Sequence, residues 1–342
     1  MIEQVVSDSL NTHMSEYIPI KSFSHVSETV RIDGASYIGR RAKMEDTHTA
    51  FLQLSDKHPD VCGMSVHDGH GGAGTSEFLR DHLREIIGAL DDPFDHKQVQ
   101  DALYALDEDL STHVWYGSTL CIVLYDRKTS KLQVINVGDS QCMILPLTFS
   151  KTGSRIAWPI YTSSKHEPGR DVYRILAAGG FIYQKRVNCE LAMSRAIGDW
   201  SYKSKELEPV KRLVSAEADI VIVDNFDPMK HMVIVFSDGL VEKWSDQHLA
   251  TTVVDKDDGT ENGIRQMIDS CFKCWTNDNM MLLRMRFAPE DFPFKVPKAT
   301  ELNSCPTTPT NQPIQVPNGI SWSRSGPPTY AWTPTEDGHV PC

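Results

Sequence analysis

Acidic residues of this sequence repeatedly stand where β-like runs meet turns. They are Asp68, Asp139, Asp238 and Asp278. A carboxylate that leaves water must pair with a positive charge or bind a cation, because burial otherwise costs several kcal/mol or keeps the group protonated. If these positions meet at one end of a sheet, their oxygens form a site for Mg²⁺ or Mn²⁺. Taken singly, each aspartate could instead cap a turn, where Asp is common.

Glycines surround one of these acids in the segment His67-Asp68-Gly69-His70-Gly71-Gly72. Glycine permits tight turns and close approach of the backbone, so the carbonyl of Gly69 could join the carboxylate as a metal ligand. His70 would then lie beside the cations, where a histidine of near-neutral pKa can donate a proton to a leaving alkoxide. A hydrogen-bonded structural histidine is the alternative interpretation.

An arginine precedes two further acids, since Arg41 lies shortly before Glu45 and Asp46. A guanidinium near a metal cluster suits recognition of phosphate oxygens, although Arg41 could also form an ordinary surface ion pair of little value. Two adjacent metals can position and ionise a water for in-line attack on phosphorus. Together these residues predict hydrolysis of a phosphate ester.

Composition narrows the class of protein. The chain has 342 residues, with 40% hydrophobic and 23% charged, which is ordinary for a globular protein. Its formal net charge of -12 disfavours nucleic acid as a partner, and with it a metal-dependent nuclease, because binders of phosphate backbones cluster Lys and Arg. The eight cysteines are scattered and fit a reducing compartment. With no apolar run of membrane-spanning length and no signal or lipidation pattern, we expect a monomer of the cytosol or nucleus without membrane contact.

The chain divides by composition into three parts. Residues 1–30 are polar and weakly patterned and are expected to form an N-terminal extension. Residues 31–288 alternate β-like and helical stretches and are expected to form the domain. Residues 289–342 are rich in Pro, Thr, Ser and Asn and predict a disordered tail. Thr308-Pro309 and Thr333-Pro334 make this tail a candidate kinase target or docking segment, and an inert tail is the alternative.

Periodicity predicts the elements that must position the acids. Apolar residues at helical spacing predict helices over Thr75–Leu90, Gln98–Val114 and Gly263–Trp275. Strands are predicted over Ser118–Tyr125, Lys131–Val137, His231–Phe236 and Met280–Phe287, the first two as an antiparallel hairpin. Runs of strands interleaved with runs of helices favour an α+β layered architecture.

In their order along the chain, the motifs closely resemble those of the protein phosphatase 2C family of metal-dependent Ser/Thr phosphatases. The resemblance covers about 240 residues. It runs through Arg41-Ala42-Lys43-Met44-Glu45-Asp46, His67-Asp68-Gly69-His70-Gly71-Gly72, Gly117-Ser118-Thr119, Val137-Gly138-Asp139-Ser140, Leu191-Ala192-Met193-Ser194-Arg195-Ala196-Ile197-Gly198-Asp199, Phe236-Ser237-Asp238-Gly239-Leu240 and Asp278-Asn279.

The resemblance implies a four-layer α-β-β-α sandwich, with two central antiparallel sheets flanked by helices. It also implies two Mn²⁺ or Mg²⁺ ions per subunit, a bridging water that attacks phosphorus, and phosphoserine or phosphothreonine proteins as substrates. The residues assigned to the two ions are Asp46, Asp68, Asp238 and Asp278, with the Gly69 carbonyl, and with Glu45 holding metal-bound water. Arg41 would bind the phosphate and His70 would be the general acid. Asp139, with Asp238, would support a weakly held third ion.

This chain departs from the family pattern at three places. Val241-Glu242 stands where Trp-Asp is usual, so a ligand of the third ion is longer by one methylene. Gln141 replaces an arginine, and Lys165 precedes His166 where an aspartate is usual. The first difference puts the third site in question, and the others could alter substrate choice.

Three alternative interpretations stay open. A catalytically idle scaffold that acts through partner binding is the alternative function, although no core acid is missing. Arg195 and Asp199 could form a structural ion pair or contact substrate. Cys271 and Cys274 could suggest zinc or redox chemistry, but a single pair on a helix is a weak signal.

Overall fold

The computed structural model describes residues 19–112, 116–148, 153, 155–274, 276–289 and 292–295. The chain divides into two units, Met1–Val296 and Pro297–Cys342, and all described residues lie in the first. Most of the predicted N-terminal extension and nearly all of the predicted tail, including both Thr-Pro pairs, lie outside the described residues. Within the described part, none of the helices is both long and apolar enough to cross a membrane.

One central sheet has six antiparallel strands. In spatial order they are β1 (Lys21–Val26), β2 (Val30–Tyr37), β15 (Met280–Phe287), β14 (His231–Phe236), β8 (Gln141–Pro146) and β9 (Tyr161–Thr162). Two of these strands, β14 and β15, have the bounds that the sequence predicts. The sheet also includes Lys21–Val26, which falls within the stretch that composition placed in an N-terminal extension.

The second sheet contains the predicted hairpin. Its strands are β12 (Ile197–Gly198), β5 (Gly117–Ser118), β4 (Val61–His70), β6 (Leu120–Asp126), β7 (Lys131–Val137) and β13 (Asp219–Val223), and β3 (Asp46–Phe51) pairs with β4. The β6 and β7 strands pair in antiparallel register, so the hairpin is confirmed. A separate two-stranded ribbon joins β10 (Ile182–Tyr183) to β11 (Arg186–Val187).

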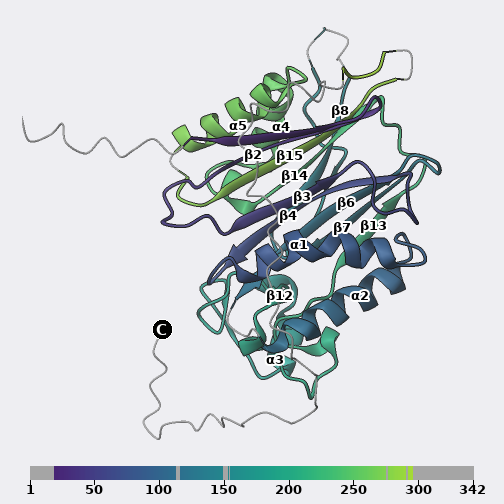
Figure 1. Cartoon of the computed structure of the whole chain (residues 1–342). Coiled ribbons are helices and arrows are strands. Elements are labelled where there is room, and N and C mark those ends of the chain that lie inside the picture. Colours follow the sequence, from purple (N-terminus) through teal and green to yellow (C-terminus); the bar gives the residue numbers. More distant parts are fainter. Residues whose placement is uncertain are drawn as a thin grey trace, which may run out of the picture. The chain divides into compact units, whose positions relative to one another are not determined.

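Helices cover the outer faces of both sheets (Figure 1). The second sheet packs against α1 (Gly74–Ala89) and α2 (His96–Asp109), and the first against α4 (Asp246–Lys256) and α5 (Glu261–Lys273). A short helix, α3 (Val172–Ala177), packs with the ribbon in a small cluster of its own. The predicted four-layer α-β-β-α sandwich is therefore confirmed.

Alternation along the strands explains why the sandwich has three apolar layers. In β14, Met232, Ile234 and Phe236 face the helices, while Val233 and Val235 face the other sheet. Successive side chains of a strand point to opposite faces, so a strand buried on both faces reads as a continuous apolar run. The strand ends are thereby held rigidly, and the acids that follow them have fixed positions.

Two helices, α3 and α4, were not predicted from the sequence, and α4 is the longer of them. The α4 helix carries Thr251, Thr252, Val253 and Val254, which are β-branched and lose side-chain freedom in a helix. Tertiary packing outweighs this cost, because Leu249 and Val253 are completely buried against the first sheet. The helix also begins at a favourable cap, since Ser245 accepts a hydrogen bond from the His248 amide.

Candidate active site

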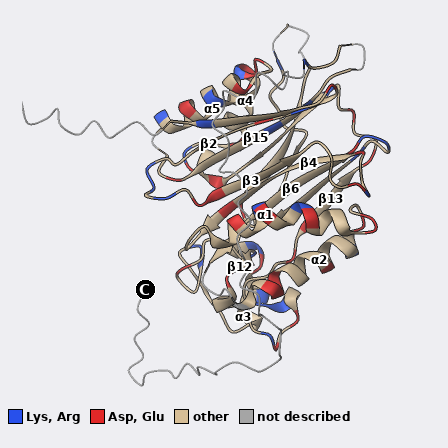
Figure 2. Ribbon diagram, in the orientation of Figure 1, with Lys and Arg blue, Asp and Glu red and all other residues tan. Residues whose placement is uncertain are grey.

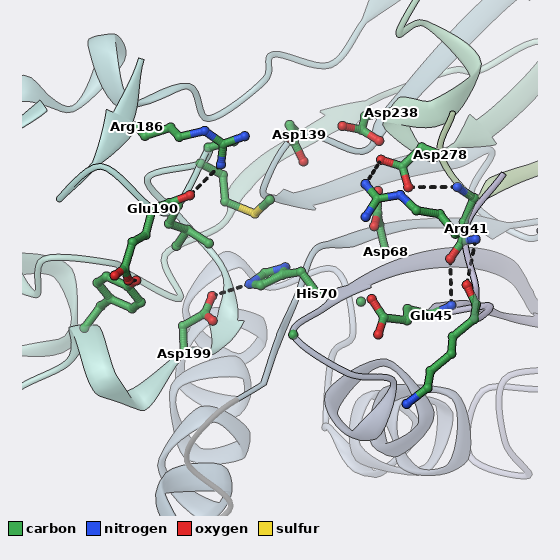
Figure 3. Close-up of a pocket in the computed structure, with 18 of the residues that line it drawn as sticks. Arg41, Glu45, Asp68, His70, Asp139, Arg186, Glu190, Asp199, Asp238 and Asp278 are labelled. Carbon is green, nitrogen blue, oxygen red and sulfur yellow. Dashed lines mark hydrogen bonds and ion pairs between the residues drawn. The ribbon is translucent and has the colours of Figure 1, made fainter. Parts of the chain in front are cut away.

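A cavity of about 900 Å³ lies at the strand ends and gathers acids from distant parts of the chain. Its acidic lining includes Asp68 from β4, Asp139 after β7, Asp238 after β14 and Asp278 before β15. Figure 3 shows these four carboxylates pointing toward one another, with Arg41 and Glu45 beside them. The structure thus brings together the aspartates that stand at strand ends in the sequence.

Asp46 lies behind this surface and does not line the cavity. It pairs with Asp68 across the β3–β4 ladder, so the two acids occupy neighbouring strands at the same level. Asp46 is buried, and its Oδ2 accepts a hydrogen bond of 2.7 Å from the Ser237 hydroxyl. Ser237 immediately precedes Asp238, so this contact ties the two sheets together beneath the acids.

The acids of the cavity are held at high electrostatic cost. Burial, and then repulsion from neighbouring carboxylates, raises the pKa of Asp238 to about 7. Burial likewise raises the pKa of Asp46 to about 7, against the stabilising hydrogen bond from Ser237. The pKa of Asp68 lies well above its ordinary value for the same two reasons. The protein groups around these carboxylates supply too little positive charge to keep all of them ionised.

The donor set fits a hard divalent cation. Carboxylate oxygens are the preferred ligands of Mg²⁺ and Mn²⁺, and Asp139 Oδ1 is buried without a hydrogen-bond partner among the described residues. Within the same residues, however, no three His, Cys, Asp or Glu side chains are close enough to hold an ion by themselves. A cation here would therefore need main-chain carbonyls and waters to complete its ligands, as is usual for Mg²⁺.

Gly69 provides the close backbone approach that such a site requires. A Cβ atom at this position would lie 2.6 Å from the Glu45 carbonyl oxygen and 2.7 Å from the Ser76 hydroxyl. Both distances are too short for a real contact, so a side chain cannot be accommodated without displacing the Glu45 backbone. The glycine therefore keeps the Asp68 to His70 backbone next to Glu45.

His70 is oriented by a residue that the sequence did not assign to it. Its Nε2 is 2.7 Å from Asp199 Oδ2, and its Nδ1 is buried without a hydrogen-bond partner in the described structure. Burial lowers the pKa of His70, but the hydrogen bond with Asp199 and the charges of Asp199, Asp139 and Glu45 outweigh burial and raise it. The histidine is thus disposed to carry a proton near neutral pH.

Asp199 does not pair with Arg195. Arg195 instead binds Asp171, with Nε 3.0 Å from Oδ2, and also approaches Glu217 and Asp219. Asp199 has a left-handed backbone, with φ of 53°, which turns its side chain toward His70. Because Asp199 is 129 residues from His70, no local pattern of the sequence could have revealed this pair.

Arg41 stands at the mouth of the cavity. Its Nη2 is 2.7 Å from Asp278 Oδ2, and 56% of its side chain is exposed. The hydrogen bond with Asp278 raises the pKa of Arg41, so the group is a permanent cation. Arg41 therefore forms an ion pair, which was the alternative interpretation from the sequence. It also faces the space where an anion would approach the acids.

Comparison with known proteins agrees with these features. The family model described as protein phosphatase 2C matches residues 30–280. The chain belongs to the protein phosphatase 2C family. It is 34% identical over 236 residues to protein phosphatase 2C homolog 2 of Schizosaccharomyces pombe, covering 64% of this chain and 60% of that protein. It is 28% identical over 298 residues to human protein phosphatase 1B, covering 79% of this chain and 60% of that protein.

Solved structures show that the fold is also that of the protein phosphatase 2C family. A phosphatase from Toxoplasma gondii superposes with a TM-score of 0.67 at 20% identity, over 81% of this chain and 98% of the other. The serine-threonine phosphatase 2C of the same organism gives a TM-score of 0.62 at 17% identity, over 79% and 100% of the two chains. The chain spans about half to two thirds of the length of the first curated relatives it matches.

Asn279, within the last family motif, joins the two parts of the cavity wall. Its Oδ1 accepts a 2.7 Å hydrogen bond from the Glu45 amide, and its Nδ2 donates to the carbonyls of Ile38 and Lys43. The loop that carries Arg41 and Glu45 is thereby fixed beside Asp278. The motif was recognised in the sequence, but this positioning role requires contacts over more than 230 residues.

Glu242, where this chain departs from the family pattern, is not among the described residues that line the cavity. Its Oε2 accepts hydrogen bonds from the Thr276 hydroxyl and the Asn277 amide, and its Oε1 pairs with Lys243. Despite partial burial, these contacts lower its pKa to about 2. In this structure Glu242 therefore braces the loop before Asp278, and its role as a ligand of a third ion stays a prediction.

The other residues that differ from the family pattern, or lie next to such a residue, interact with groups of the same fold. Gln141 is buried, and its Nε2 donates to the Ser163 carbonyl. His166 is completely buried, and its Nδ1 accepts a 3.0 Å hydrogen bond from the Gly138 amide beside Asp139. Lys165 contributes a positive charge that opposes the rise in the pKa of Asp139, for which burial is the largest cause.

The two cysteines of the weak zinc or redox signal face different surroundings. Cys271 is buried in the core under α5, while Cys274 is exposed, and both are free thiols. Burial raises the pKa of the Cys271 thiol above its usual value, which disfavours the thiolate form needed for metal binding or redox chemistry.

Proposed function

We propose that this chain is a metal-dependent protein serine/threonine phosphatase that hydrolyses phosphoserine and phosphothreonine. The observation that carries the proposal is the convergence of Asp68, Asp139, Asp238 and Asp278 on one cavity, together with Arg41 and His70. Membership of the protein phosphatase 2C family supports the same activity. The alternative of an idle scaffold has no specific observation in its favour.

Two Mn²⁺ or Mg²⁺ ions are proposed as the resident cofactors. Their ligands would be Asp46, Asp68, Asp238 and Asp278, with the Gly69 carbonyl, and with Glu45 acting through water. Asp139 would add a weaker third position together with Asp238. When bound, such ions supply positive charge to phosphate oxygens and lower the pKa of water.

The chain's own side chains would bind and orient the substrate. Arg41 is exposed at the cavity mouth, so its guanidinium can bind two oxygens of an incoming phosphate. His70 would donate a proton to the serine or threonine oxygen that leaves. Because Nε2 is bound to Asp199, Nδ1 is the nitrogen that remains to donate.

Hydrolysis of a phosphothreonine peptide by the full chain tests this proposal. Phosphate release should require added Mn²⁺ or Mg²⁺, stop with chelator, and return when the ion is restored. Asp68→Asn should abolish release because it removes a central carboxylate of the cavity. Glu242→Gln is the matched control, since it removes an acid outside the cavity and should leave most of the activity.

Two results would contradict the proposal. One is metal-independent turnover that survives Asp68→Asn. The other is a folded, metal-loaded wild type that releases no phosphate from serine or threonine peptides, which would instead favour the idle scaffold.

A further inference from the structure

A second charged cluster lies on the helix-covered face of the first sheet. Arg284 is completely buried at its centre, with Nη2 2.8 Å from Asp33 and Nη1 2.6 Å from Asp257. Three more arginines surround these two acids. Arg31 binds Asp33, while Arg155 and Arg286 bind Asp257.

Strand alternation explains why these charges are together. Met280 and Leu282 of β15 face the helices, so Arg284 and Arg286 point to the same side two and four residues further on. In the neighbouring strand, Asp33 pairs with Arg284 in the ladder. The apolar layer under α4 and α5 is therefore replaced by charged residues toward the end of β15, and Figure 2 shows basic residues there.

Positive charge exceeds negative charge in this cluster. Four guanidinium groups contact two carboxylates. A further nearby acid, Asp258, accepts hydrogen bonds from the Thr260 and Gly263 amides at the start of α5. Counting Asp258 still leaves positive charge in excess, although the whole chain carries a net charge of -12.

The excess is accompanied by unused hydrogen-bond donors. The Nε atoms of Arg284 and Arg286 are buried without a partner among the described residues. Burial and repulsion from Arg284 and Arg155 lower the pKa of Arg286 despite the attraction of Asp257. An unsatisfied buried donor costs free energy, and more so when it is charged, so the cluster is held at a cost although Arg286 Nη1 binds Asp257.

A small pocket opens beside Arg286. It has a volume of about 130 Å³ and is lined by Arg155 and Arg286, by Asp257 and Val254 of the α4 end, by Met232, and by Pro146, Leu147 and Thr148. This is room for several water molecules, and hence for one five-atom oxyanion. Met232 and Asp238 are six residues apart along extended chain, which separates this pocket from the catalytic cavity by about 20 Å.

Structural roles account for part of the cluster only. Arg155 donates to the carbonyls of Val254 and Asp257 and so satisfies the end of α4. This leaves the positive excess around the pocket without an explanation. We propose that the pocket between Arg155 and Arg286 binds a phosphate-sized oxyanion, with the two guanidinium groups as its main ligands.

Inorganic phosphate binding to the full chain, stripped of divalent cations and desalted, tests this site. Under these conditions the crowded carboxylates of the catalytic cavity repel an anion, so binding reports the arginine pocket and does not depend on enzymatic activity. Calorimetry at constant ionic strength should show one saturable site, and phosphate should raise the melting temperature. Sulfate should bind similarly, whereas phosphothreonine should bind less well if only a free anion fits.

Matched variants locate the binding. Thr148→Asp places a carboxylate at the exposed rim of the pocket and should weaken phosphate binding at least tenfold. Thr148→Asn, whose side chain has the shape of aspartate without the charge, should retain phosphate binding. Arg155→Gln should also weaken phosphate binding. If this variant fails to fold, the comparison of Thr148→Asp with Thr148→Asn still decides the test. Arg41→Ala should have no effect. Absence of binding to the wild type, equal binding to Thr148→Asp and Thr148→Asn, or loss of binding in Arg41→Ala would overturn the proposal.

Discussion

Aspartates in and directly behind the acidic cavity and aspartates of the segment around α3 meet opposite electrostatic surroundings. The pKa values of Asp46 and Asp238 are raised to about 7, with burial as the largest cause. Asp171 is also partly buried, but hydrogen bonds from Arg195, Arg174 and Ser194 outweigh burial and lower its pKa. Asp219 has a lowered pKa because His166 and Arg170 bind it. The same residue type is thus destabilised in one region and stabilised in the other.

The difference teaches which acids are available for chemistry. A carboxylate that is fully paired with arginines contributes to folding and cannot readily exchange its partners. Carboxylates crowded without counter-charge are costly to the folded protein, and such sites commonly bind cations. The acids around α3 stabilise that segment, and the acids of the cavity remain available to bind cations.

Among the changes that compare the two regions, Asp238→Asn should reduce activity most, and it should not destabilise the folded protein. We expect metal-dependent hydrolysis to fall roughly a thousandfold, the upper range for loss of one key electrostatic group. The metal-free variant should melt at the same temperature as the wild type or higher, because a repelled carboxylate is removed. Initial rates with a phosphopeptide check the loss of activity, and a melting curve checks the stability. A variant that keeps full activity would make Asp238 an ordinary turn residue.

The pH dependence of this stabilisation should follow the pKa of Asp238. Between its ordinary value of 3.8 and about 7, the folded metal-free protein binds a proton that the unfolded chain lacks. The wild type is therefore increasingly penalised as pH rises through this range, and Asp238→Asn is not. The gain in free energy of unfolding should grow from near zero at about pH 3 to at most roughly 4 kcal/mol at pH 8.

Denaturant unfolding of both proteins at several pH values measures that difference. Buried histidines with lowered pKa values, such as His48 and His67, act in the opposite direction, but they are common to both proteins and cancel. Saturating Mg²⁺ should remove the gain, since cations then compensate the charge. If the difference in free energy of unfolding between the two proteins were constant with pH, the ionised Asp238 carboxylate would not be destabilised in the folded protein.

Asp171→Asn should instead act on stability. Removing one partner of a buried ion pair leaves the other uncompensated, so we expect a loss of roughly 3 kcal/mol. Arg195 and Arg174 would both lose a ligand. Urea unfolding measures the loss. Asp224→Asn is the matched control, because Asp224 is exposed and its ion pair within the described part of the chain is a long one, with Lys131 at 4.0 Å. Equal stability of the two variants would remove the contrast between the two regions.

Much of the fold could be predicted because long apolar runs leave few alternatives. The β14 and β15 strands and the β6–β7 hairpin follow from runs that only a buried strand explains. The α4 helix could not be predicted, since its β-branched residues favour strands and only packing against the first sheet makes it helical. Pairing between distant strands, such as β2 with β15, also has no local signal.

The site shows the same division. Acids at strand ends were recognisable, because the strands themselves were recognisable and Gly69 signalled a close backbone approach. Their partners were not, since Ser237 reaches Asp46 across 191 residues and Asp199 reaches His70 across 129. Glu242 was assigned from a position in a motif, and the hydrogen bond that it accepts from the Asn277 amide also has no local signal in the sequence.

Asp199→Asn should give the smallest effect, a loss of about tenfold at alkaline pH, which is less than the roughly hundredfold or more that a general acid itself contributes. Asp199 acts through His70, whose pKa it raises by a hydrogen bond and by its charge. The asparagine should therefore lower the pKa of His70, and the alkaline limb of the pH profile should move to lower pH. Activity should recover toward the wild-type value as pH falls, because the histidine becomes protonated again.

A double-mutant cycle separates this positioning role from a merely structural one. His70→Gln should remove the alkaline limb, and adding Asp199→Asn to it should cause little further loss, because the two residues act as one unit. If Asp199 only supported the fold, the two losses would add and the limb would stay in place in Asp199→Asn. Asp199 would then belong with Asp171 and Asp219 among the acids that stabilise the protein. The cavity would in that case contain acids of both kinds, those that stabilise the fold and those that are destabilised by it.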